Sequence, residues 1–336
     1  MKYRDLNLSR RSFLKASALA SASLSMPLTA LAQEAFPSRA MQVVIPTGEG
    51  GGVDQAARAF TRIWAKHLGA DFEFSYYAGA SGQVGYETYL GRTEADAHNL
   101  LFGNIAPEMI MYATQNPNFN YPDDIQYIGS IDIDDSVIWV AENSPFQTIE
   151  DMIEEGQRRP ITLSTSRLPH PSTIGALLLA EETGMTVRMV PYGGGGPARS
   201  AAITGEVDGC ATFLSSSLGV GDQLRFLGVF NNVNAAPELT NDAPSLNEAL
   251  GLSMPALYGQ RAWAIHTAAI NEHPERVERL RETMQQVFDD AEYREVAERA
   301  GTPWQFIQYG SPEECDATAT AILALAERYN DVLTGN

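Results

Sequence analysis

Lysine is almost absent from this chain of 336 residues, and cysteine occurs only twice. Lys66 is the only lysine outside the first 32 residues, whereas 42 acidic residues give the chain a formal net charge of −19. This excess of negative charge makes nucleic acid and anionic lipid surfaces poor partners. The scarcity of lysine also excludes a P-loop, because no glycine-rich segment continues as Gly-Lys-Ser or Gly-Lys-Thr.

Motifs for metal binding and for nucleophilic catalysis are missing as well. The histidines show no H-x-H or H-E-x-x-H spacing and the cysteines no C-x-x-C spacing, so a zinc site has no support. The segment GASGQVG (79–85) resembles a nucleophile elbow, but Gln83 stands where the G-x-S-x-G motif needs glycine. We therefore expect no metal, no cofactor and no catalytic residue, while pairing of Cys210 with Cys315 stays open.

The first 32 residues have the order of an export signal. SRRSFLK (9–15) matches a twin-arginine signal, an apolar stretch follows, and Ala30-Leu31-Ala32 supplies a small-residue cleavage site. We expect export to the periplasm by the twin-arginine route. Without this segment the net charge is about −23, because five basic residues and one acidic residue are removed.

Short apolar runs alternate with amphipathic segments from residue 38 onward, which is typical of an α/β fold. In a helix predicted over 54–68, four apolar side chains share one face and are expected in the core. They are Ala57, Phe60, Trp64 and Leu68.

The second half of the chain repeats the alternation and ends in helices. Two long helices are predicted, over 274–298 and 312–333. Two α/β lobes joined by crossing strands near 134–141 and 257–264 would explain this order of elements.

Two glycine-rich turns each join an apolar strand to a helix. In PTGEGGGVD (46–54) the glycines leave the backbone N–H groups open to a ligand, and the helix N-terminus adds unpaired donors and its positive dipole end. VPYGGGGPARSAAITGEVD (190–208) also joins a strand to a helix through glycines, and Pro197 suits the first position of a helix. Such loops bind a carboxylate or phosphate without Lys or Arg. They predict an anion held between two lobes, and two merely tight turns are the alternative.

A third loop, STSRLPHPS (164–172), combines Ser166, Arg167 and His170 between a predicted strand and a helix. Arg167 could clamp a carboxylate through two parallel hydrogen bonds. A solvated surface arginine is the alternative.

Together these segments resemble the periplasmic receptors of tripartite tricarboxylate transporters, also called Bug-type extracytoplasmic solute receptors. FPSRAMQVVIPTGEGGGVDQAAR is similar to the family's opening strand, Gly-Gly-x-x-Asp loop and helix, and AGASGQVG is similar to its second glycine-rich turn. The 190–208 segment is similar to the family's most distinctive stretch, and APSLNEALGL (243–252) to its Pro-Thr-Leu-x-Glu-x-Gly stretch. The resemblance implies a two-lobed type II periplasmic-binding-protein fold of class α/β, with a hinge of two crossing strands.

The resemblance also implies an activity and partners. The family captures a small organic carboxylate between its lobes and delivers it to a membrane permease, without catalysis. We expect a monomer whose first lobe comprises residues 33–135 and 260–336 and whose second lobe comprises 136–259. A receptor that senses the ligand for a membrane signalling partner is the alternative, and an exported carboxylate-processing enzyme is a third interpretation.

The loops and the resemblance together nominate a set of ligand-binding residues. They are Thr47, Gly48, Glu49, Gly50, Gly51, Asn104, Ser166, Arg167, His170, Tyr192, Gly193, Gly194, Thr212 and Phe213.

Three segments depart from the family's pattern. Glu49 stands where proline is usual, the 164–172 loop has less glycine, and ADAHNLLF (95–102) replaces a typical Asp-Gly-Tyr-Thr-Leu run. We hypothesise that Glu49 faces a hydroxyl, an amine or a bridging water, because an unpaired carboxylate against an anion is costly. A Glu49 side chain that points to solvent is the alternative.

Overall fold

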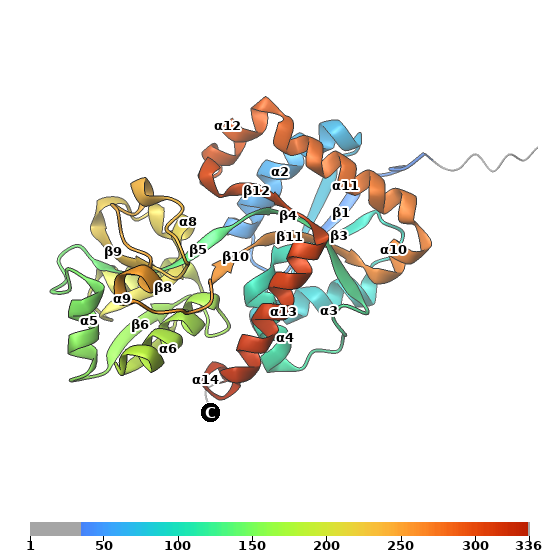
Figure 1. Cartoon of the computed structure of the whole chain (residues 1–336). Coiled ribbons are helices and arrows are strands. Elements are labelled where there is room, and N and C mark those ends of the chain that lie inside the picture. Colours follow the sequence, from blue (N-terminus) through green and yellow to red (C-terminus); the bar gives the residue numbers. More distant parts are fainter. Residues whose placement is uncertain (1–34, 335–336) are drawn as a thin grey trace, which may run out of the picture. The chain divides into compact units, whose positions relative to one another are not determined.

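The computed structural model describes residues 35–334, so the predicted signal at 1–32 lies outside the described residues. Within the described range, every helix and strand belongs to the unit that begins at Arg39. Figure 1 shows two groups of strands, each with its own helices.

The first sheet has the strand order β12-β4-β11-β3-β1-β2. Its strands β1, β2 and β3 are parallel to one another, whereas β11 is antiparallel to β3 and β4, and β12 is antiparallel to β4. The strands are β1 (Met41–Ile45), β2 (Phe72–Tyr76), β3 (Asn99–Asn104), β4 (Ile125–Asp132), β11 (Arg261–His266) and β12 (Ile307–Gly310).

Helices from distant parts of the chain cover this sheet. One group packs together: α2 (Gly52–Leu68), α11 (Pro274–Asp289) and α12 (Ala291–Arg299). A second group contains α3 (Gln83–Arg92), α4 (Ile105–Gln115) and α13 (Pro312–Arg328), and α13 lies along α4 (Figure 1). Short helices complete this part: η1 (Ala80–Gly82), α10 (Thr267–Glu272), η4 (Trp304–Phe306) and α14 (Asn330–Thr334).

The second sheet has the strand order β10-β5-β8-β6-β7, and β9 also pairs with β5. Its strands are β5 (Asp134–Ala141), β6 (Ile161–Thr165), β7 (Val187–Pro191), β8 (Gly209–Phe213), β9 (Leu224–Val229) and β10 (Tyr258–Gly259). Its helices are α5 (Ile149–Gly156), α6 (Pro171–Thr183), α7 (Gly195–Ile203), α8 (Leu214–Leu218), η2 (Gly221–Gln223), η3 (Pro237–Leu239) and α9 (Leu246–Leu250). β5 is buried along its whole length, including Asp134, Asp135 and Ser136 at its start, and its apolar run begins at Val137.

The chain passes between the two sheets at two places. Ile133 separates β4 from β5, and Gln260 separates β10 from β11. These places fall near the crossings predicted from the sequence. The mixed α/β class is confirmed, since both sheets alternate with helices along the chain.

Helix α2 begins where its apolar periodicity predicts, within two residues. Ala57, Phe60, Trp64 and Leu68 are all buried, as predicted. The Trp64 ring lies 5.5 Å from the Phe60 ring and 5.1 Å from the Trp263 ring, in edge-on contact with both. Aromatic pairs prefer such arrangements, so this face forms the core between α2 and the first sheet.

Both predicted long helices are wrong as single elements. The first is divided into α11 and α12, because the Asp290 side chain accepts a hydrogen bond from the Glu292 N–H at 2.9 Å and so caps a new helix. The second is divided into α13 and α14 at Tyr329. The sequence interpretation also missed helix α4, which follows β3 directly.

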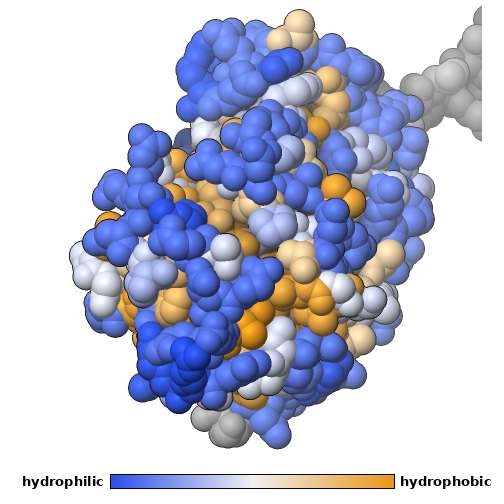
Figure 2. All heavy atoms as spheres, turned by 60° about the vertical axis from the view of Figure 1, so that its left-hand side comes forward, coloured by the Kyte–Doolittle hydropathy of each residue, from blue (hydrophilic) through white to orange (hydrophobic). Residues whose placement is uncertain are grey.

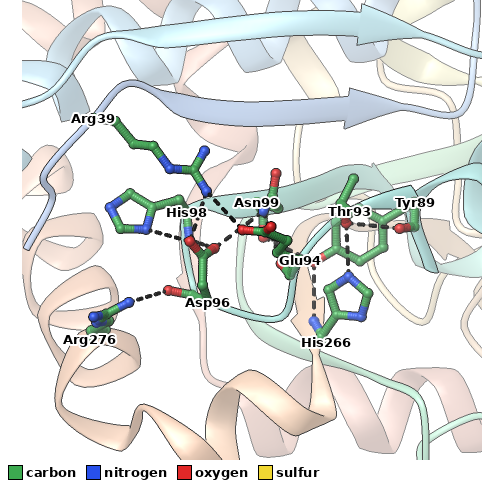
Figure 3. Close-up of polar contacts among 9 residues, drawn as sticks. All are labelled: Arg39, Tyr89, Thr93, Glu94, Asp96, His98, Asn99, His266 and Arg276. Carbon is green, nitrogen blue, oxygen red and sulfur yellow. Dashed lines mark hydrogen bonds and ion pairs between the residues drawn. The ribbon is translucent and has the colours of Figure 1, made fainter. Parts of the chain in front are cut away.

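The unusual 95–102 segment is explained by a polar cluster around Asp96 (Figure 3). The Asp96 carboxylate accepts hydrogen bonds from Arg39 Nη2 at 2.7 Å and from the His98 N–H at 2.9 Å. Arg276 Nη1 donates to the Asp96 carbonyl at 2.9 Å, which joins α11 to the same loop. This cluster lies where β3 begins, so it stabilises the end of the sheet opposite Asn104.

Candidate functional site

The nominated residues lie at the carboxyl ends of parallel strands. Thr47 follows β1 and Asn104 ends β3 in the first sheet, while Ser166 follows β6 and Phe213 ends β8 in the second. Ligands of open α/β sheets bind outside the carboxyl ends of their strands. The local sequence therefore places these residues at the edge where a site is expected.

Asn104 of the first sheet and Phe213 of the second sheet meet at Gly259. A methyl group on Gly259 would lie 2.7 Å from Asn104 Nδ2 and 2.7 Å from Phe213 Cζ, so both side chains reach this glycine. The Phe213 ring lies 4.3 Å from the His170 ring. Asn104 Oδ1 accepts a hydrogen bond from the Gln260 N–H at 3.1 Å, which orients its amide. Asn104, His170 and Phe213 are thus brought together as one group.

Arg167 lies in the loop after β6 of the second sheet and donates a hydrogen bond to η1, which precedes α3 beside the first sheet. Its Nη1 donates to the Ser81 carbonyl at 2.7 Å, although 86 positions separate the two residues. Burial lowers the pKa of Arg167, and the nearby charge of Glu108 offsets part of this effect. The solvated surface arginine that the sequence left open does not describe this residue.

Glu108 is a buried carboxylate beside Arg167. Its oxygens accept hydrogen bonds from the Tyr86 hydroxyl at 2.6 Å and from the Asn104 N–H at 2.8 Å. Burial raises the pKa of Glu108 to about 7, although both hydrogen bonds and the charge of Arg167 act against the increase. The charge of this group therefore changes near neutral pH.

The first glycine-rich loop is held by Asp54, a buried residue in the first turn of α2. Its Oδ2 accepts a hydrogen bond from the Gly50 N–H at 2.8 Å, so this amide is already engaged. Its Oδ1 accepts from Arg58 Nε at 2.8 Å and from the Tyr76 hydroxyl at 2.7 Å. Within residues 35–334, the N–H groups of Gly48 and Gly51 have no hydrogen-bond partner. The loop therefore offers fewer free amides than its glycine content suggests.

The Glu49 side chain is 70% exposed, and its Oε1 lies 3.4 Å from Arg58 Nη2. This ion pair compensates the carboxylate without a ligand. The hypothesis that Glu49 faces a polar group of the ligand stays a prediction.

The second glycine-rich loop continues directly into α7, with Gly194 before the helix. A methyl group on Gly195 would lie 2.9 Å from Arg199 Nη1, so the Arg199 guanidinium lies against this loop. The Tyr192 hydroxyl donates to Glu206 at 2.9 Å. The ligand-binding roles of Tyr192, Gly193 and Gly194 stay predictions.

His170 caps helix α6. Its Nδ1 accepts a hydrogen bond from the Ser172 N–H at 3.2 Å, and burial, with the charge of Arg167, lowers the pKa of His170 to about 3. The ring is therefore neutral at physiological pH.

Three other nominated residues carry hydroxyl groups. Thr212 Oγ1 lies 3.2 Å from Ser216 Oγ. Thr47 Oγ1 is buried with no partner among the described residues, and Ser166 is half-buried.

The sequence interpretation missed Ser81, Glu108 and Arg199. Glu108 had a local signal, since a carboxylate four residues after Asn104 can reach the unpaired N–H groups where a helix begins. Ser81 contributes only its carbonyl, so no side-chain pattern could identify it. Arg199 follows Gly195 by one helical turn, and this spacing places its side chain over the loop.

Two classes of feature are not found within residues 35–334. No group of three or more His, Cys, Asp or Glu side chains there could hold a metal ion. No helix of this part is long and apolar enough to cross a membrane.

The two cysteines, Cys210 and Cys315, are both buried and unpaired. This answers the question of their pairing that the sequence left open.

An α/β chain with two sheets, two crossings and glycine-rich loops at the strand ends has an architecture similar to that of solved solute-binding proteins. The family model described as "Tripartite tricarboxylate transporter family receptor" matches residues 56–306. This chain belongs to that family, which confirms the resemblance seen in the sequence.

Individual relatives agree with this assignment. The chain is 27% identical over 252 residues to the "UPF0065 protein in tcbD-tcbE intergenic region" of Pseudomonas sp. strain P51, covering 73% of each chain. Its fold is similar to R. palustris Rpa4515, solved with adipate (TM-score 0.73, 21% identity, 89% of this chain and 98% of that one). It is also similar to MatC (Rpa3494) from Rhodopseudomonas palustris, solved with bound malate (TM-score 0.68, 19% identity, 89% and 100%).

Proposed function

We propose that this chain is a periplasmic receptor that binds a small organic carboxylate and delivers it to the membrane permease of a tripartite tricarboxylate transporter. The ligand is released chemically unchanged. Family membership supports this role, and adipate and malate bound to two proteins of similar fold support a carboxylate ligand. The twin-arginine signal in residues 1–32 would export the chain to the periplasm.

The observation that carries the proposal is the half-buried cation Arg167. Its hydrogen bond to the Ser81 carbonyl uses one nitrogen, Nη1, and a carbonyl contributes no full negative charge. An anionic ligand would offset the cost of burying the guanidinium, and a carboxylate matches its planar donors. Arg167 therefore provides a positive charge at this site in an otherwise acidic chain.

The ligand would be enclosed by rotation of two lobes. We assign residues 33–135 and 260–336 to the first lobe and 136–259 to the second. The strand content of the two sheets supports this division, although β5 of the second sheet already begins at Asp134. Ligand contacts that form only in the closed arrangement would shift the population toward it. The crossings at Ile133 and Gln260 are the positions at which the backbone would turn.

A thermal-shift screen of residues 33–336 tests the proposal. The panel contains mono-, di- and tricarboxylates, aromatic acids, amino acids and sugars. A ligand at a hundred times its dissociation constant should stabilise the protein by about 2.7 kcal/mol. Stabilisation by a carboxylate that mass spectrometry recovers unchanged is expected. Stabilisation only by neutral or cationic compounds, or conversion of the acid, would contradict the proposal.

Site variants make the test specific. Arg167→Gln should weaken binding of the identified acid by about tenfold or more, because it removes a charge-assisted hydrogen bond. Arg158→Gln is the matched control, since Arg158 is exposed and its ion pairs within residues 35–334 are with neighbouring carboxylates of α5. Equal affinity of the two variants would exclude Arg167 from the site. Glu49→Gln should change the ligand preference, and an unchanged preference would favour the solvent-facing alternative.

A further inference from the structure

Arg261 joins the two crossings on the side of the first sheet. It is the first residue of β11, and its Nε lies 2.7 Å from Asp132 Oδ2. Its backbone N–H also donates to Asp132 Oδ1 at 3.2 Å. Asp132 is the last residue of β4, directly before Ile133. One carboxylate therefore fixes both the backbone and the side chain of Arg261.

The same guanidinium reaches the first glycine-rich loop. Arg261 Nη1 donates to the Gly52 carbonyl at 3.1 Å, across 209 positions of sequence. Gly52 is the first residue of α2 and directly follows Gly51, which has a free N–H within the described residues. Arg261 thus connects the crossings to a loop that was nominated for ligand binding.

Carboxylates on both sides of Ile133 act on this cation. Burial lowers the pKa of Arg261, but the charges of Asp132 and Asp134 more than offset burial, so the pKa is raised and the group stays charged. Asp134 begins β5, and its Oδ1 accepts a hydrogen bond from the Ser215 N–H of α8 at 2.9 Å. The electrostatic environment of Arg261 therefore includes both sheets.

Stability alone does not account for this arrangement. Arg261 Nη2 is buried and has no hydrogen-bond partner within residues 35–334. Buried donors are normally paired, because an unpaired one loses its hydrogen bond to water. A buried ion pair is also weak support for stability, since desolvation opposes the attraction. Arg261 does link Asp132 to Gly52.

We propose that Arg261 is a positioning residue for the ligand loop. Through the Gly52 carbonyl it holds the loop in a fixed place relative to the crossings, so that rotation there is transmitted to the loop's backbone amides. Its effect on affinity rests on the proposed function. Its effect on the rigidity of the loop does not, and can be measured without a ligand.

The test compares Arg261→Lys with the wild-type chain. Lysine keeps a cation beside Asp132 but lacks the planar fork that reaches Gly52 at the same time. Hydrogen exchange of the Gly50 and Gln55 amides reports on the loop, because these N–H groups bond to Asp54 and to the Gly51 carbonyl. We expect about tenfold faster exchange at these two amides, unchanged exchange in β3, and about tenfold weaker binding of the acid found by thermal shift.

Arg39→Lys is the matched control. Arg39 forms an Arg–Asp pair of the same length, 2.7 Å, with Asp96 at the other end of the first sheet (Figure 3). We expect neither loop exchange nor affinity to change in this variant. If Arg261→Lys does not fold, Asp132→Asn loosens the same anchor and should accelerate loop exchange in the same direction.

The outcomes separate the inference from the proposed function. Unchanged exchange of Gly50 and Gln55 in Arg261→Lys would overturn the positioning role. Equal acceleration of all amides would also overturn it, because the residue would then support only global stability. If the wild-type chain binds no carboxylate, the proposed function fails while the exchange result still decides the role of Arg261.

Discussion

Replacing Glu108 by glutamine should change how the stability of this protein depends on pH. Burial raises the pKa of Glu108 to about 7 in the folded chain, compared with an ordinary value of 4.5. Glutamine has nearly the same shape and can still accept the Asn104 N–H, but it does not titrate. The variant therefore isolates the contribution of one proton.

The sign follows from proton binding in the two states. Between pH 4.5 and 7 the folded chain holds the Glu108 proton and the unfolded chain has released it. The contribution of Glu108 to the free energy of unfolding is therefore fully present below pH 4.5 and is lost as the pH rises through 7. The loss amounts to about 3 kcal/mol.

Urea unfolding of both proteins from pH 4 to 8.5 measures this loss. The free energy of the wild type minus that of Glu108→Gln should fall by about 3 kcal/mol over the range, because other groups titrate in both proteins and cancel. Glu87→Gln is the control. Hydrogen bonds from Gln83 and the Asn118 N–H lower the pKa of Glu87, so the pH range in which Glu87 changes the free energy of unfolding lies below 4.5. A flat difference for Glu108→Gln would refute the burial argument.

Two further predictions concern packing and thiols. Gly103→Ala should destabilise the fold by about 1–3 kcal/mol, because the new methyl group would lie 2.3 Å from both Glu108 carboxylate oxygens. Gly91→Ala, within α3 and facing open space, should stabilise by about 0.5–1 kcal/mol; equal melting shifts for the two variants would contradict this reasoning. Cys210 and Cys315 are buried with pKa values raised by burial to about 12, so a thiol reagent should label neither in the native protein and both after denaturation. Rapid native labelling, or fewer than two thiols after denaturation, would show that the cysteines are exposed or paired.

The hydrophilic surface agrees with the charged composition. Figure 2 shows one face of the molecule on which hydrophilic residues predominate and hydrophobic residues form patches between them. Many basic residues on the exterior are engaged in exposed ion pairs, such as Arg158 with Glu154 and Arg294 with Glu298. Exposed pairs of this kind add little to stability.

The sequence by itself determined the α/β class, the family and the positions of the loops. These features depend on local pattern: the apolar face of α2 follows a helical period, and glycine-rich turns follow directly from strand ends. The division of the predicted 274–298 helix at Asp290 was also a local event, but a short cap is easily hidden inside a continuous helical pattern.

Only the tertiary structure decided which groups meet at the site. Arg167 finds the Ser81 carbonyl across 86 positions, and Arg261 finds the Gly52 carbonyl across 209. Both acceptors are backbone atoms, which carry no residue-specific signal. Their availability depends on how the loops are placed when the sheets pack, and so does the burial that raises the pKa of Glu108 and lowers that of Arg167. Sequence therefore predicts where the ligand loops lie, while packing determines which charges they present.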